Sequence, residues 1–128
     1  MKLLESAENY LESILMLKEQ KGSVRSIDVA RQMGFSKPSV SRAMGLLREN
    51  GYIVVDKEGW IELTQSGLAV ASAIYERHCL LSRWLTALGV SAEVAAKDAC
   101  LMEHDISEET FEKLKAHIEK DMGPQNKG

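Results

Sequence analysis

The sequence predicts a mainly α-helical protein in which two short helices and a β-hairpin precede an all-helical region. Three observations lead to this fold class. Apolar residues recur at helical spacing along most of the 128 residues. Two of the helical stretches are short and are joined by a turn that contains glycine. Two runs rich in β-branched and aromatic residues follow them directly, and beyond these runs only helical patterns occur.

The first two helices are predicted from apolar spacing and end signals. Residues 4–20 carry apolar side chains mostly three or four positions apart. Residues 26–33 predict a short helix, with Ser26 as its N-cap and Gly34 as its stop.

The next helix follows after a three-residue turn and covers residues 37–50. Ser36 is its expected N-cap, Pro38 lies in the first turn where its missing N–H costs nothing, and Gly51 ends it. Two short helices joined in this way are a helix-turn-helix signature.

Two β-rich runs come next, Tyr52–Val55 and Trp60–Leu63. The linker between them, residues 56–59, contains glycine, as is typical of a hairpin. A helix-turn-helix followed by a hairpin predicts a winged helix.

The remaining chain predicts helices only. A long helix continues to about Leu88, a second covers roughly residues 92–104, and a third runs from Ser107 to about Lys120. Their expected N-caps are Thr64, Ser91 and Ser107.

Composition indicates a globular protein that is neither exported nor embedded in a membrane. The apolar runs are far shorter than the roughly 20 residues of a membrane span. The N-terminus has acidic residues within its apolar pattern, unlike a signal peptide. We therefore expect a cytoplasmic protein with reduced cysteines. A disulfide between Cys79 and Cys100 is the alternative.

Charge is distributed unevenly along the chain. The net charge is −3, yet residues 21–50 hold six basic and two acidic side chains. A basic block within an acidic protein indicates a local contact with a polyanion. Because this block coincides with the helix-turn-helix, we expect double-stranded DNA as the partner; a winged helix used for protein contacts is the alternative.

The DNA contacts follow from the usual placement of such a motif, whose second helix enters the major groove. Residues at the start of that helix would meet base edges, and other basic residues would meet phosphates. The candidates for base edges are Ser36, Lys37, Pro38, Ser39 and Arg42, and those for phosphates are Arg25, Lys37, Arg48 and Lys57.

Potential metal ligands occur on three predicted helices. Cys100, Glu103 and His104 are spaced i, i+3, i+4 and therefore project from one helix face. On the first helix the same argument places Asn9 and Glu12 on one face, and His78 lies on the long helix. Taken alone, a single histidine or such a cluster is more often an ordinary part of a helix than a metal site.

Several segments together resemble the DtxR/MntR family of metal-dependent transcriptional repressors. They are "SAENYLESI", "VRSIDVARQMGFSKPSVSRAMGLLRENGYI", "IELTQSG", "RHCLLSRWL" and "DACLMEHDIS". The resemblance implies a homodimer with a winged-helix DNA-binding region, a helical dimerisation region and divalent metal bound between them. The chain is similar to the short, manganese-type members of the family, which lack an SH3-like domain. The implied domains are residues 1–63 for DNA binding, 64–122 for metal binding and dimerisation, and 123–128 as a flexible tail.

Carried over by position, the resemblance implies the metal ligands Asn9, Glu12, His78, Cys100, Glu103 and His104. Two of them depart from the manganese-type pattern, which has Asp at position 9 and Glu at position 100. Cys100 resembles the iron-type pattern, but the iron-type ancillary site is incomplete, because Ser82 and Ala96 stand in place of its Glu and His.

The donor atoms favour particular ions. Manganese prefers oxygen ligands, whereas thiolate and imidazole favour iron, cobalt or zinc. We therefore expect Fe²⁺ first and Mn²⁺ next, with Zn²⁺ or Co²⁺ able to bind in vitro.

The leading hypothesis is a repressor that binds a palindromic operator when loaded with metal and controls metal-homeostasis genes. The alternative is a metal-independent winged-helix regulator that responds to a small organic ligand. A third hypothesis, an enzyme with Cys100 as nucleophile and His104 as base, lacks an evident oxyanion hole or substrate loop. We expect no enzymatic activity.

Overall fold

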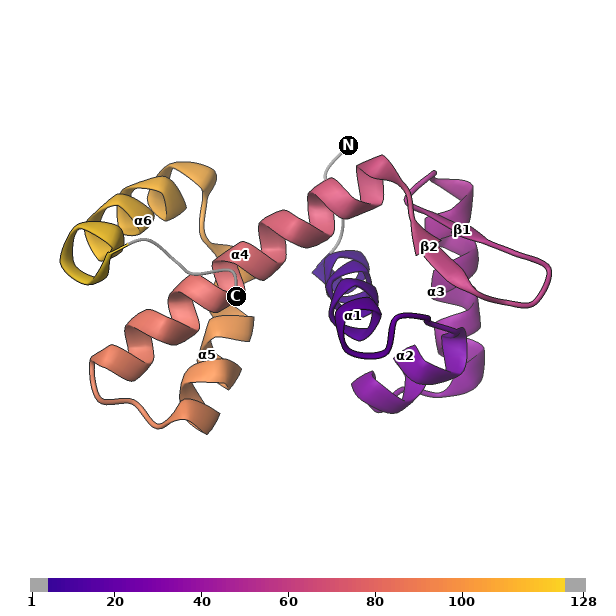
Figure 1. Ribbon diagram of the computed structural model, residues 1–128, viewed down its shortest axis with the longest axis horizontal. Helices are drawn as coiled ribbons and strands as arrows, with labels where there is room; N and C mark the ends of the chain where they lie inside the picture. The colour runs from indigo at the N-terminus through magenta and orange to yellow at the C-terminus, as the bar shows by residue number, and fades with distance from the viewer. Residues whose placement is uncertain (1–4, 124–128) are drawn as a thin grey trace. The chain divides into compact units, whose positions relative to one another are not determined.

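The computed structural model describes residues 5–123, so the first residue of the predicted first helix and most of the predicted tail lie outside the described residues. The chain divides into two compact units, Met1–Ala73 and Ile74–Gly128. The elements, labelled in Figure 1, are α1 Glu5–Lys21, α2 Ser26–Met33, α3 Lys37–Glu49, β1 Ile53–Val55, β2 Ile61–Leu63, α4 Gln65–Ala87, α5 Ala92–Asp105 and α6 Glu108–Met122. The predicted mainly α fold with a winged helix-turn-helix is confirmed. Within residues 5–123, no helix combines the length and apolar character that a membrane span requires.

The core of the first unit forms where the apolar stripes of α1, α2 and α3 meet. Leu11 and Ile14 of α1 are fully buried, as are Val29 of α2 and Val40 of α3. On α3 the buried positions continue at i+4 and i+7, which leaves the first turn and the opposite face of this helix in solvent.

Helix α3 begins as the sequence predicts. The Oγ of Ser36 accepts a hydrogen bond from the backbone N–H of Ser39 at 3.3 Å, and Pro38 occupies the first turn. Helix α3 ends at Glu49, Asn50 is its C-cap, and the chain then passes through Gly51 at a φ of +80°.

The predicted N-cap of α2 is wrong by one residue. Arg25, not Ser26, has the extended backbone of the N-cap, and Ser26 is the first helical residue. The N–H of Ile61 donates to the carbonyl of Val24 at 2.7 Å, which holds the chain before α2 in an extended conformation alongside the hairpin. Asp28 closes the start of the helix, since its Oδ2 accepts the N–H of Arg25 at 2.9 Å.

Asp28 also pairs with Lys21 at the end of α1, with Nζ and Oδ1 2.5 Å apart. The hydrogen bond from Lys21, followed by the N–H of Arg25, lowers the pKa of this carboxyl below its usual value. The charged form of Asp28 therefore ties α1 to the start of α2.

The hairpin pairs β1 with β2 in antiparallel register, with Val54 opposite Glu62. Helix α4 then starts against the residue just before β1, Tyr52. A Cβ at Gly67 would lie 2.0 Å from the carbonyl oxygen of Tyr52, so only glycine permits this close approach. The predicted cap is confirmed: Oγ1 of Thr64 accepts the N–H of Gly67 at 3.1 Å.

The second unit is built from the remainder of α4 with α5 and α6. Its core consists of Leu80 of α4 with Phe111 and Ile118 of α6, all at most 3% exposed. The predicted caps Ser91 and Ser107 are confirmed at the starts of α5 and α6. The structure does not join Cys79 of α4 to Cys100 of α5 in a disulfide, which answers the open question about this pair.

Candidate metal centre and nucleic-acid interface

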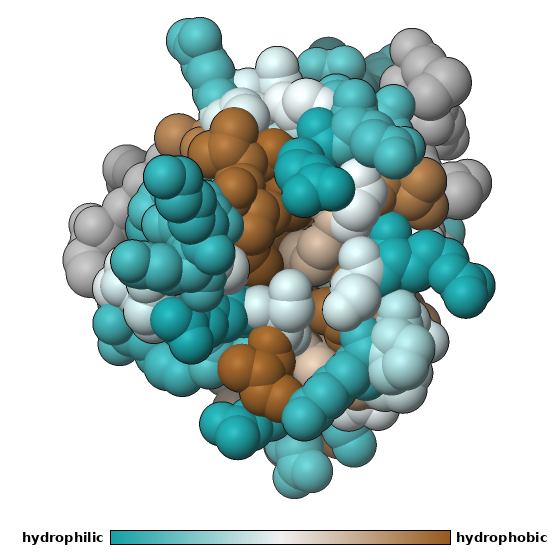
Figure 2. All heavy atoms as spheres, turned by 90° about the vertical axis from the view of Figure 1, so that its right-hand side faces the viewer, coloured by the Kyte–Doolittle hydropathy of each residue, from teal (hydrophilic) through white to brown (hydrophobic). Residues whose placement is uncertain are grey.

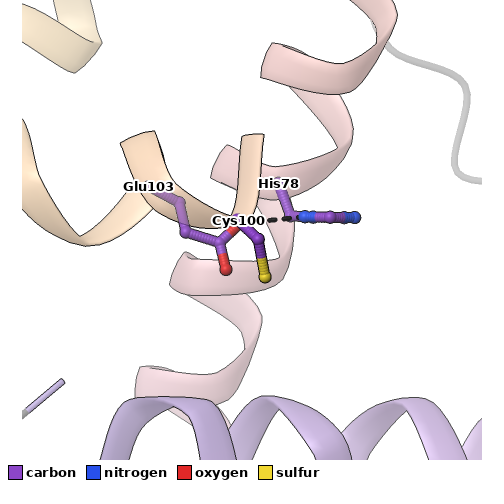
Figure 3. Close-up of side chains that lie close together, drawn as sticks. All are labelled: His78, Cys100 and Glu103. Atoms are coloured by element: carbon purple, nitrogen blue, oxygen red, sulfur yellow. Dashed lines mark hydrogen bonds and ion pairs between the residues drawn. The ribbon is translucent and has the colours of Figure 1, made fainter. Parts of the chain in front are cut away.

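Three of the predicted ligands gather in the second unit. His78 comes from α4, and Cys100 and Glu103 come from α5 (Figure 3). A nitrogen of the imidazole, Sγ of Cys100 and a carboxylate oxygen of Glu103 all lie within 4.8 Å of one another. The i, i+3 spacing places the thiol and the carboxylate on one face of α5, and tertiary structure adds the imidazole.

Glu103 occupies a position that the pattern of α5 would assign to an apolar residue. Ala95, Ala99 and Glu103 are spaced four apart and are each 0% exposed, so the carboxylate continues the buried stripe of the helix. Burial of a carboxylate is costly unless it is paired or coordinates a metal. Its position therefore indicates a functional role.

The neighbours of Glu103 satisfy it only in part. Oε2 lies 3.0 Å from Nδ1 of His78, and Oε1 lies 3.4 Å from Nε2 of His104. Oε1 is buried and has no hydrogen-bond partner within residues 5–123. A buried acceptor left in this state costs about 1–3 kcal/mol. A cation beside this oxygen would remove that cost, so the residues present fit a metal ion.

The donor set is mixed in chemical character. It combines an anionic oxygen, an imidazole nitrogen and a sulfur, a set that suits iron, cobalt or zinc better than magnesium or calcium. Cys100 is exposed whereas the side chain of Glu103 is fully buried, so the group reaches from the interior to solvent.

Of the other predicted ligands, His104 also lies on α5 in the second unit, and Asn9 and Glu12 lie on α1 in the first unit. The side chain of His104 is 1% exposed beside Glu103. Asn9 and Glu12 lie one turn apart on α1 in the first unit. The ligand role of all six residues stays a prediction.

The predicted DNA-contacting residues are accessible. All eight lie in exposed positions: Arg25, Ser36, Lys37, Pro38, Ser39, Arg42, Arg48 and Lys57. Figure 2 faces the side of the chain that carries α3 and the hairpin, and it shows mostly hydrophilic side chains around a smaller group of hydrophobic ones. Since Val40 and Met44 anchor the inner face of α3, its first turn is free to meet a ligand.

Arg25 is held in place by the hairpin. Its guanidinium carbon lies 4.0 Å from the centre of the Trp60 ring, a cation–π geometry. The sequence pattern named Arg25 as a phosphate contact but gave no sign of its aromatic platform, because the two residues are far apart along the chain.

A cavity of about 270 Å³ lies between the start of α2 and the first turns of α3. Ser26, Ile27, Lys37 and Ser41 line it. Ser26 and Ser41 were not among the sequence candidates. The signal for Ser41 was available, since it lies one helical turn after Lys37 and shares its face.

Comparison with known proteins matches both halves of the chain to one family. Residues 2–60 match the family described as "Iron dependent repressor, N-terminal DNA binding domain". Residues 64–122 match "Iron dependent repressor, metal binding and dimerisation domain".

Individual relatives agree with this assignment. The chain is 34% identical over 116 residues to the transcriptional regulator MntR of an Escherichia coli strain, which covers 91% of this chain and 75% of that protein. It is 30% identical over 109 residues to the HTH-type transcriptional regulator MntR of Bacillus subtilis, covering 85% and 77%. These relatives are transcriptional regulators and not enzymes.

Solved structures share the fold. A manganese-dependent transcriptional repressor in complex with manganese superposes with a TM-score of 0.83 at 28% identity, over 94% of this chain and 54% of that one. The manganese regulator SloR gives 0.79 at 27% identity, over 97% and 56%. The chain therefore spans just over half the length of these two proteins. With both halves matched in order, the chain belongs to the iron-dependent repressor family, the DtxR/MntR family of metal-dependent transcriptional repressors.

Proposed function

We propose that this chain is a cytoplasmic, metal-responsive repressor of metal-homeostasis genes. In this proposal it binds a palindromic operator as a homodimer when it is loaded with Fe²⁺ or Mn²⁺. The observation that carries the proposal is the convergence of ligand atoms of His78, Cys100 and Glu103 within 4.8 Å. Oε1 of Glu103 is also buried and has no hydrogen-bond partner among residues 5–123.

The proposed ligands act by their charge and their position. Glu103 supplies an anionic oxygen from the buried stripe of α5, His78 supplies a nitrogen from α4, and Cys100 supplies sulfur at the exposed end. A divalent ion, when bound, would supply the positive charge that this group of donors lacks. Asn9, Glu12 and His104 complete the proposed ligand set on the basis of sequence.

The proposed DNA contacts divide by role. Ser36, Pro38, Ser39 and Arg42 would meet base edges, since they lie at the exposed start of α3. The basic residues Arg25, Lys37, Arg48 and Lys57 would meet phosphates. A dimer would place its two α3 helices about 34 Å apart, as a palindrome requires.

The identity of the ion is the finer part of the proposal. Cys100 favours Fe²⁺ over Mn²⁺ because sulfur is a soft ligand. The names of the MntR relatives point to manganese, and the family description names iron. We place Fe²⁺ first and Mn²⁺ second; Zn²⁺ and Co²⁺ would bind in vitro through the same donors.

Anaerobic fluorescence anisotropy tests the function directly. A labelled duplex, selected from a random pool by the metal-loaded protein, is titrated with the chain in chelator, in Fe²⁺ and in Mn²⁺. We expect metal to tighten DNA binding by about 5- to 150-fold, the usual range of allosteric coupling. Glu103→Gln should remove this effect. Asp98→Asn, an exposed acid on the same helix, is the matched control and should behave as wild type.

Two outcomes would contradict the proposal. Equal affinity in chelator and in each metal would favour the metal-independent regulator. Failure of the metal-loaded protein to enrich any duplex would remove the DNA-binding function itself.

A further inference from the structure

Helix α4 contacts the end of α5 through Arg77, the residue next to His78. Nη1 of Arg77 donates to the backbone carbonyl of Glu103 at 3.1 Å and to that of Ile106 at 3.0 Å. Arg77 was not a candidate in the sequence, because nothing local distinguishes it from an ordinary basic residue on a helix.

These two carbonyls need an external donor. Helix α5 ends at Asp105, and Ile106 has the extended backbone of its C-cap. The last four carbonyls of a helix have no N–H partner within it. A guanidinium can bond two of them at once, and its charge is favourable at the negative end of the helix dipole.

Arg77 is itself held at a fixed position. Its guanidinium carbon lies 5.0 Å from the centre of the Phe111 ring, and Phe111 is 3% exposed in the core of the second unit. The side chain is therefore fixed on one side by α6 and on the other by the end of α5.

Arg77 and His78 both contact Glu103, a candidate metal ligand. His78 contacts the side chain of Glu103, with Nδ1 and Oε2 3.0 Å apart, while Arg77 bonds the main chain of the same residue. Two consecutive residues of α4 thus fix both the backbone and the carboxylate of Glu103.

We propose that Arg77 is a positioning residue of the metal centre, which sets the distance between His78 and Glu103 before a metal binds. This inference rests on the proposed metal function. Residues that orient metal ligands typically change affinity by about 10- to 100-fold when they are replaced.

The same helix offers a matched control. Nη2 of Arg83 donates to the carbonyls of Met122 and Gly123 at 2.7 and 2.8 Å, and so closes the end of α6 as Arg77 closes the end of α5. Replacement of either arginine removes a guanidinium from α4 and two bonds to a helix end. Only the replacement of Arg77 releases the backbone of a candidate ligand.

The experiment compares wild type, Arg77→Gln and Arg83→Gln in anaerobic titrations with Co²⁺, followed by the thiolate-to-cobalt absorption band. We expect Arg77→Gln to bind Co²⁺ about 10- to 100-fold more weakly and with an altered band. Arg83→Gln should keep the affinity and the spectrum of wild type, even if its thermal unfolding temperature falls. A residue with a structural role alone would not change the spectrum selectively.

Hydrogen exchange on the metal-free protein gives a second measurement. We expect faster exchange in the last turn of α5 for Arg77→Gln and in the last turn of α6 for Arg83→Gln. If Arg77→Gln does not fold, Arg77→Lys is measured by the same criterion, since an ammonium cannot reproduce the two-carbonyl geometry.

The outcomes of these measurements distinguish the positioning role of Arg77 from the proposed metal function. If wild type binds Co²⁺ and the two variants lose affinity equally, or neither does, the positioning role is overturned and the proposed function stands. If wild type itself does not bind Co²⁺, the proposed function fails and the inference fails with it.

Discussion

Nδ1 of His78 and Oε2 of Glu103 lie 3.0 Å apart, although the two residues are 25 positions apart in the chain. This pair leaves the second oxygen of Glu103 buried and without a hydrogen bond among residues 5–123. The buried carboxylate of Glu103 therefore carries a local cost that a bound cation would relieve.

The first prediction follows from that cost. In Glu103→Gln the buried group is neutral. We therefore expect the free energy of unfolding of the metal-free variant to equal that of wild type or to exceed it by up to about 1 kcal/mol. At a metal concentration 100 times Kd, the free energy of unfolding of wild type should rise by about 2.7 kcal/mol, and that of the variant should hardly change. Thermal unfolding with and without Co²⁺ measures both effects. A variant that is stabilised by Co²⁺ as strongly as wild type would show that Glu103 is not a ligand.

Cys100 should determine which ion binds best. Cys100→Asp replaces a soft sulfur with a hard oxygen, so we expect the ratio of Fe²⁺ to Mn²⁺ affinity to fall by about tenfold or more. Competition titrations under anaerobic conditions report this ratio. Cys79→Asp, at the other cysteine of the chain, is the control and should leave the ratio unchanged. An unaltered ratio in Cys100→Asp would remove sulfur from the coordination sphere.

Trp60 should contribute to DNA affinity without touching DNA. Its ring lies 4.0 Å from the Arg25 guanidinium carbon and so limits the freedom of that side chain. Cation–π contacts at exposed sites contribute about 0.5–1 kcal/mol, so Trp60→Leu should weaken DNA binding by about two- to fivefold. A double-mutant cycle with Arg25→Ala isolates the coupling. Additive losses would mean that the stacked geometry does not matter for binding.

Gly67→Ala should destabilise the first unit. The added Cβ would lie 2.0 Å from the Tyr52 carbonyl oxygen, and this oxygen also accepts the N–H of Thr64 at 3.0 Å. Overpacking of this kind costs about 1–3 kcal/mol, which urea denaturation would detect. Gly45→Ala on α3 is the control, because no atom lies within 4 Å of its added Cβ. It should be neutral or slightly stabilising.

Asp28 should make stability depend on pH in the acid range. Its pKa in the folded chain is lowered, first by the hydrogen bond from Lys21, so the charged form stabilises the fold above the unfolded value near 3.8. That contribution is lost as pH falls through the lower folded pKa. Because the partner Lys21 is half exposed, solvent weakens the ion pair. We therefore expect the free energy of unfolding at pH 7 to be higher for wild type than for Asp28→Asn by less than about 1 kcal/mol. The difference should shrink as the pH falls below about 3.8. A difference that does not change between pH 7 and pH 2 would contradict the charge argument.

The sequence by itself determined the elements, because their signals are local. Ser36 and Pro38 predict the start of α3, and Gly34 predicts the end of α2. Each of these residues acts on backbone atoms within a few positions, so no distant contact is needed. The spacing of Cys100 and Glu103 likewise requires only that α5 is a helix.

The tertiary structure decided what depends on residues distant in the chain. It brought His78 to Glu103, seated Arg77 on the end of α5 and stacked Arg25 on Trp60. It also shifted the cap of α2 from Ser26 to Arg25, since the bond between Ile61 and Val24 extends the chain there. Such contacts depend on how the apolar faces of the helices pack. The role of a buried carboxylate on one of those faces therefore depends on the side chains that packing places around it.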